Sequence, residues 1–131
     1  MTATGIAASG LKAAATRLEA SASNVANAQS AGSLPVETIE PIRPVYRPLR
    51  TLLSARAQGG LTAALLQQAR SYAAYAPNLP FADASGMAAY PAVDPALEAA
   101  ERASAMAAFR ANLSVIRAAD EMMQRLLDVR A

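Results

Sequence analysis

The residue types that perform most enzyme chemistry are missing from this chain of 131 residues, which contains neither histidine nor cysteine. The usual nucleophile and base pairs, and most transition-metal sites, therefore lack their reactive groups. The nearest approach to a catalytic pair is Asp120 beside Glu121. Adjacent helix positions point about 100° apart, and Arg117 and Arg125 lie one turn away, so a solvated charged face is the better interpretation. We expect no enzyme activity, cofactor, metal site or small-molecule substrate.

The densest basic run is the second place where chemistry would be sought. Arg43, Arg47 and Arg50 flank Tyr46, a pattern that suits nucleic acid or an anionic membrane. Three arginines supply few phosphate contacts, and the formal net charge is only +2. A basic helical binding module for nucleic acid or membrane stays open as an alternative. A polar contact between protein subunits is the stronger interpretation, without a nucleic-acid partner.

The composition indicates a chain that depends on neighbouring subunits. Hydrophobic residues make up 53% of it and aromatic residues only 5%, and alanine, which buries little area per residue, supplies much of the apolar count. We therefore expect a thin core, a poorly ordered monomer, and apolar surface that other chains complete.

The first residues do not resemble a secretion signal. Lys12, Arg17 and Glu19 interrupt the alanines, and no leucine-rich segment of a signal peptide forms. No stretch reaches the roughly 20 apolar residues of a membrane-spanning helix. If the protein is exported, we expect a route without a cleavable signal peptide.

Two terminal amphipathic helices are the elements that would make subunit contacts. Apolar and small residues recur there at alternating spacings of three and four, which places them on one helical stripe. We expect the first helix within residues 1–32, ending near Asn27 with a turn at Gly32. Its stripe consists of Leu11, Ala14, Leu18, Ser21, Val25 and Ala28.

The second helix is expected over residues 94–131. Asp94 is a suitable cap and Pro95 fits the first helical position. The wide apolar face suggests contact with more than one helix. Its stripe consists of Arg102, Ala105, Phe109, Asn112, Ile116, Ala119, Met123 and Leu126, and Met106, Leu113, Met122 and Leu127 widen it.

The middle of the chain, residues 33–93, is expected to be extended and β-rich. Four prolines between Ser33 and Leu49 exclude a long helix and favour an edge strand or extended arm. Gly59-Gly60 predicts a turn, and residues 61–75, although rich in helix formers, are assigned to strand as its second arm. Residues 76–95 are predicted to be an irregular connection. The predicted fold is mainly α with a small β insertion, in which the two terminal helices form one domain.

Three amides have two possible roles each. Asn24 and Asn27 are suited either to capping carbonyls at the helix end or to a polar contact between subunits. Asn112, on the C-terminal stripe, either fixes helix register or faces solvent.

The sequence resembles the flagellar axial proteins, and within them the basal-body rod family, closest to its proximal-rod branch FlgC. Ser23-Asn24-Val25-Ala26-Asn27-Ala28, followed by Gly32, is similar to the N-terminal motif that rod, hook and hook-associated proteins share. Tyr75-Ala76-Pro77-Asn78-Leu79-Pro80-Phe81-Ala82-Asp83-Ala84-Ser85-Gly86 resembles a segment of the FlgC branch. Residues 91–94, 102–112 and 119–123 continue the similarity.

The resemblance implies a structural subunit of the proximal rod, or a divergent paralogue elsewhere in the axial structure. It implies coiled-coil-like packing of both terminal helices in an axial tube, and export through the flagellar type III apparatus without cleavage. The implied partners are copies of itself, other rod proteins, the rod adaptor and the membrane-supramembrane ring, in a rod that spans the periplasm. The residues expected at subunit interfaces are Leu11, Ala14, Leu18, Asn24, Val25, Ala26, Asn27, Phe109, Asn112, Ile116, Ala119, Met123 and Leu126.

Overall fold

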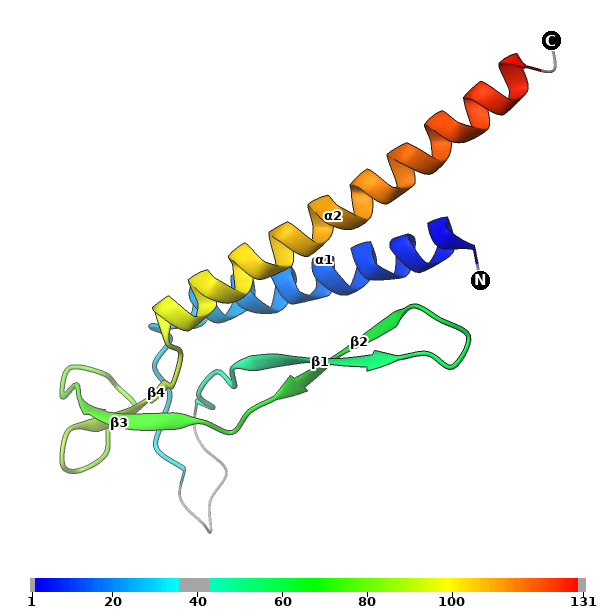
Figure 1. Ribbon diagram of the computed structural model, residues 1–131. Helices are drawn as coiled ribbons and strands as arrows, with labels where there is room; N and C mark the ends of the chain where they lie inside the picture. Colours follow the sequence, from blue (N-terminus) through cyan, green and yellow to red (C-terminus); the bar gives the residue numbers. More distant parts are fainter. Residues whose placement is uncertain (1, 36–42, 130–131) are drawn as a thin grey trace.

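The computed structural model describes residues 2–35 and 43–129 of the chain, and Figure 1 shows a long helix at each end with strands between them. The predicted class, mainly α with a β insertion, is confirmed. The part of the predicted extended arm that falls on residues 36–42 lies outside the described residues. In chain order the elements are α1 (Ala3–Asn27), β1 (Leu49–Ala55), β2 (Leu61–Gln67), β3 (Ser71–Tyr75), β4 (Met87–Pro91) and α2 (Pro95–Asp128).

The two helices begin and end where local chemistry predicts. Thr2 caps α1 by accepting a hydrogen bond from the Gly5 N–H at 3.2 Å. Asp94 caps α2 by accepting from the N–H groups of Ala96 and Leu97 at 2.9 and 3.3 Å, with proline in the first turn. The predicted end of α1 near Asn27 and the predicted start of α2 at Asp94 or Pro95 are both confirmed.

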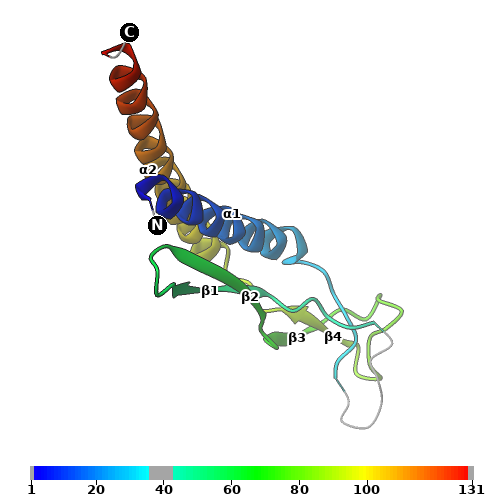
Figure 2. The same ribbon diagram turned by 90° about the vertical axis from the view of Figure 1, so that its right-hand side faces the viewer.

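The helices lie side by side and antiparallel, as both ribbon views show (Figures 1 and 2). The last turns of α1 face the first turns of α2, where Asn24 contacts Glu98. Further along, Gly10 of α1 lies against Asn112 of α2. Because α2 has 34 residues and α1 has 25, the C-terminal end of α2 projects past the start of α1.

The β region consists of two separate antiparallel hairpins, β1-β2 and β3-β4. In the first, which lies against α1, Leu49 pairs with Gln67 and Ala55 with Leu61. Its turn contains Gly59 and Gly60 with φ of 86° and 92°, a conformation that favours glycine. The predicted turn and the assignment of strand rather than helix after it are therefore confirmed.

The second hairpin corrects two boundaries. The predicted single strand over residues 61–75 is two strands, because the chain leaves the first hairpin at Gln68 and begins β3 at Ser71. The stretch predicted to be irregular, residues 76–95, contains β4, which pairs with β3 from Met87 to Pro91. Local turn signals did not reveal β4 because it is defined by its pairing with β3, across the intervening residues 76–86. Tyr72 and Tyr90 stack across this hairpin with ring centroids 5.9 Å apart.

The core is thin, as its composition predicted. Among the described residues, the buried hydrophobic side chains of the core are all alanines: Ala7, Ala13, Ala14, Ala20, Ala88, Ala89 and Ala105. Alanine gains little from burial, since each buried CH₂ group contributes only about 0.8 kcal/mol. The arrangement therefore depends on close backbone approach and hydrogen bonds more than on large interlocking side chains.

Gly32 marks one of these close backbone approaches. Its N–H and C=O both bond to the backbone of Ala89 at 2.9 Å, which ties the segment after α1 to β4. A Cβ at this position would lie 2.5 Å from the backbone nitrogen of Val45. Three chain segments therefore meet at a point where only glycine fits.

Candidate assembly interface

The α1-α2 contact is lined by small residues of α1. Ala7, Gly10, Ala14, Ser21 and Asn24 are buried along its length at spacings of three, four, seven and three, and the half-buried Arg17 lies on the same stripe between Ala14 and Ser21. Of the stripe predicted for this helix, Ala14 and Ser21 belong to this buried seam. The larger members of the predicted stripe lie to one side of this seam. Leu11 and Leu18 are half-buried, while Val25 and the neighbouring Ala26 are exposed.

A network of polar side chains fixes the register between the end of α1 and the start of α2. Arg17 pairs with Glu101 and donates a hydrogen bond to Ser104 Oγ at 3.1 Å. One turn along, Ser21 Oγ donates to the backbone carbonyl of Glu98 at 3.1 Å. The sequence did not single out this network, because its members lie about 80 positions apart and only the helix pairing brings them together.

Asn24 connects both helices with the first hairpin. Its amide nitrogen donates to Leu49 O at 2.8 Å and to Glu98 Oε1 at 2.7 Å. Its oxygen accepts from the Leu49 N–H at 2.7 Å and from the Tyr46 hydroxyl at 3.0 Å. An amide offers two donors and one oxygen acceptor with two lone pairs, so this residue, only 3% exposed, uses its whole capacity within the chain.

The other two amides bond to their own helices. Asn27 donates to Ser23 O at 2.9 Å, which is the local capping role considered for it. Asn112 donates to Ala108 O at 2.8 Å while its side chain lies against Gly10 of α1. Both are half-buried, and Asn112 sits in the helix seam rather than facing solvent.

The predicted stripe of α2 follows the seam and then continues beyond it. Phe109, Ile116 and Ala119 are half-buried on the same side as Asn112. The register from Glu98 to Asn112 brings the first turn of α1 opposite about Ile116 to Ala119. Met123 and Leu126 extend the same stripe but are 64% exposed each.

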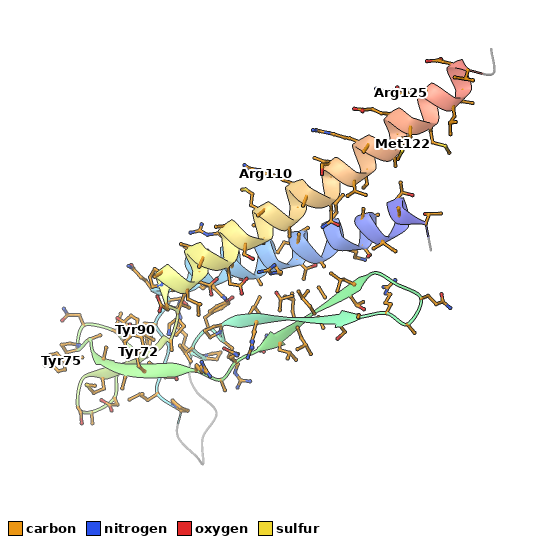
Figure 3. The ribbon with its side chains drawn as sticks, in the orientation of Figure 1. Tyr72, Tyr75, Tyr90, Arg110, Met122 and Arg125 are labelled. Atoms are coloured by element: carbon orange, nitrogen blue, oxygen red, sulfur yellow. The ribbon has the colours of Figure 1, made fainter. Side chains whose placement is uncertain are left out.

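We call this projecting segment, residues 120–129, the α2 overhang. Figure 3 shows Met122 and Arg125 on this overhang, beyond the N-terminal end of α1. Met122 is 60% exposed and Leu127 is 69% exposed, so the apolar face widens where α1 no longer covers it. Monomeric proteins rarely leave a contiguous apolar patch of this kind without a partner.

The arginines of the basic run lie in different surroundings, one beside an aromatic ring and one beside carboxylates. The Arg43 guanidinium lies 5.3 Å from the centroid of the Phe81 ring, and Arg50 lines a cleft that also contains Glu98 and Glu101. Tyr46, between them, is held by Asn24 and by Ser23 Oγ at 2.8 Å. These residues contact other parts of the same chain, as a folded subunit would arrange them.

One protein family matches the part of the chain that contains the α2 overhang. Residues 84–129, which include β4 and α2, match the flagellar basal body rod FlgEFG protein C-terminal domain. This part of the chain is similar to the C-terminal domain of the flagellar basal-body rod proteins. No curated protein matches the chain. The rod family is structural, and its place is the basal body of the flagellum.

The match over residues 84–129 agrees with the rod family predicted from the sequence and supports a structural role in the rod. The match names the FlgEFG domain and leaves the FlgC branch unassigned. Neither α1 nor α2, as described, has an apolar stretch long enough to cross a membrane.

Proposed function

We propose that the chain is a structural subunit of the proximal rod, assembling through its terminal helices into the axial drive-shaft that motility requires. The observation that carries this proposal is the α2 overhang. Its apolar stripe is continuous with the seam that α1 covers, but extends beyond it. The overhang is therefore suited to receive a helix from a neighbouring subunit along the same line.

The energetics favour assembly over an isolated monomer. Burying a leucine or methionine side chain fully contributes about 1.5–3 kcal/mol, and the overhang presents four such side chains, Met122, Met123, Leu126 and Leu127. The alanine core within the chain offers little comparable burial. We infer that subunit contacts supply a large share of the stability of the assembled state.

The predicted interface residues divide into two proposed roles. The open side of α1, at Leu11, Leu18, Val25 and Ala26, and the end of the α2 stripe, at Met123 and Leu126, contact other subunits in coiled-coil-like packing. Phe109, Ile116 and Ala119 join these two surfaces along the seam. The amides Asn24 and Asn112, together with Ala14, hold the helix pair in the register that presents these surfaces, while Asn27 secures the end of α1 through Ser23.

The partners follow from this place in the rod. We propose copies of this chain, other rod proteins, the rod adaptor and the membrane-supramembrane ring as neighbours in the periplasm-spanning rod. We also propose export through the flagellar type III apparatus. Both rest on the rod family and on the resemblance to FlgC at residues 75–86.

The test is Leu126→Asp in the source bacterium, read as swimming motility and as recovery of the chain in isolated basal bodies. Leu126 lies beyond α1, so the change should leave the monomer intact and remove the chain from the rod. Gln124→Asp is the matched control, because it adds the same charge on the polar side of the same turn.

Normal motility and normal recovery of the Leu126→Asp chain in basal bodies would disprove the assembly role of the overhang. Loss of motility with Gln124→Asp as well would show that any added charge there is harmful. In that case the apolar stripe would not be the cause.

A further inference from the structure

The β1-β2 hairpin has two edges whose backbone groups can be assigned from its hydrogen bonds. The Arg56 N–H donates to Gly60 O at 3.0 Å and the Gln68 N–H donates to Pro48 O at 2.8 Å. In an antiparallel ladder bonded pairs alternate with unbonded ones. The even-numbered residues of β2 therefore bond to β1, and the odd-numbered residues direct their N–H and C=O groups outward.

Hydrogen bonds with α1 agree with this assignment, and they occupy outward-facing backbone groups of one residue on each edge of the hairpin. Asn24 pairs with the outward N–H and C=O of Leu49 on β1. Ser9 Oγ accepts from the outward N–H of Leu61 on β2 at 3.0 Å. Beyond Leu61, the outward groups of Ala63, Leu65 and Gln67 have no bond to another described residue.

The β2 edge lacks the features that protect free edges. Proteins usually guard such edges with charged residues, proline or a bulge. The segment Leu61–Gln67 contains no charged residue and no proline, and its pairing with β1 is regular throughout. The edge is therefore ready to accept another strand.

A groove of about 380 Å³ runs between this edge and α1. Lys12 and Thr16 line it from the helix, and Arg56 and Ala63 line it from the hairpin. Both cations are exposed, and no acidic residue is among the residues lining the groove. The groove thus places uncompensated positive charge beside Ala63, at one end of the open row of backbone donors and acceptors.

We propose that the β2 edge docks an extended, carboxylate-bearing segment of a neighbouring chain as an added strand. The backbone of the segment pairs with Ala63, Leu65 and Gln67, and its carboxylates lie near Lys12 and Arg56. Strand addition of this kind gains affinity from main-chain bonds and selectivity from flanking side chains. The surface is separate from the overhang, so this contact goes beyond the assembly role proposed above.

The test measures binding of a fluorescent Val-Glu-Val-Glu-Val peptide to the full chain by fluorescence anisotropy, with Val-Lys-Val-Lys-Val as the charge control. Ala63→Pro removes an outward N–H without touching the β1-β2 ladder, and should weaken binding by at least about tenfold. Thr51→Pro is the matched control, since Thr51 lies outward on the β1 edge, and it should bind normally. The thermal transition of each variant reports its folding.

Charge variants give an independent readout. Lys12→Gln and Arg56→Gln should each weaken binding about twofold to fivefold and reduce its salt dependence. Arg110→Gln, on the side of α2 away from α1 (Figure 3), should have no effect. These variants decide the question if Ala63→Pro does not fold.

Equal binding of the two peptides, or unchanged binding by both charge variants, would overturn the proposal. Pairing of two β2 edges in a dimer that the acidic peptide does not displace would also overturn it. The assay uses the isolated chain, so its failure is distinguishable from a failure to enter the rod.

Discussion

Gly10 and Asn112 meet across the two helices so closely that a Cβ at Gly10 would lie 2.5 Å from the Asn112 side-chain oxygen and 2.7 Å from its Cγ. The Asn112 amide is held in this place by its hydrogen bond to Ala108 O. The absence of a side chain at one position therefore creates the space for the amide at the other. This contact sets how near α1 and α2 approach.

The effect of Gly10→Ala should depend on Asn112. In the natural chain we expect destabilisation, because the amide must leave its place and its bond to Ala108. In an Asn112→Ala background we expect stabilisation of about 1 kcal/mol from the higher helix propensity of alanine. A double-mutant cycle of urea unfolding should give a coupling energy of about 1–3 kcal/mol. Additive effects would show that the two residues do not compete for space.

Asn24→Asp should destabilise the junction of the helices with the first hairpin. A carboxylate still accepts from Leu49 and Tyr46 but cannot donate to Leu49 O, and it faces the Glu98 carboxylate. We expect a loss of about 2–4 kcal/mol in the free energy of unfolding, from one orphaned carbonyl and one repulsive pair. Chemical denaturation measures it.

Asn27→Asp is the control for this prediction, because among the described residues the Asn27 side chain bonds only to Ser23 of its own helix. Asn27→Asp should lower the free energy of unfolding by clearly less than Asn24→Asp does. Equal losses in the two variants would argue against a special role for Asn24.

Gly32→Ala should break the crossing of three segments. The new Cβ would meet the backbone of Val45 and Arg43 at 2.5 and 2.7 Å, and backbone cannot rotate away as a side chain can. We expect a loss of about 1–3 kcal/mol and faster hydrogen exchange at the Ala89 N–H, which donates to Gly32 O. Unchanged exchange at Ala89 would mean that the crossing tolerates a side chain.

Truncation after Asp120 should separate folding from assembly. Residues 121–129 are all exposed, so removing residues 121–131 should shift the midpoint of thermal unfolding by less than about 3 °C. The same truncation should abolish incorporation into basal bodies. A large fall in the unfolding temperature would instead show that the overhang supports the fold of the single chain.

The sequence determined the features that depend on neighbouring residues. Asp94 and Pro95 specify a helix start because a carboxylate caps free N–H groups and proline fits the first turn. Gly59 and Gly60 specify a hairpin turn because both adopt positive φ. The length of the α2 stripe was also readable, since its large apolar residues alternate with charged ones. The resemblance to rod proteins at residues 91–94, 102–112 and 119–123, which lie within the matched segment 84–129, was readable from short motifs in the same way.

Only the tertiary structure decided which face of α1 meets α2. Alanine occupies so many positions of α1 that several stripes are equally apolar, and periodicity alone favoured the one containing Leu11, Leu18 and Val25. The helices instead pack through Gly10 and its small neighbours, because small residues permit the closest approach of two backbones. The strand β4, the network around Asn24 and the register that exposes the α2 overhang likewise join residues far apart in the chain, and their positions are fixed by contacts that no local pattern contains.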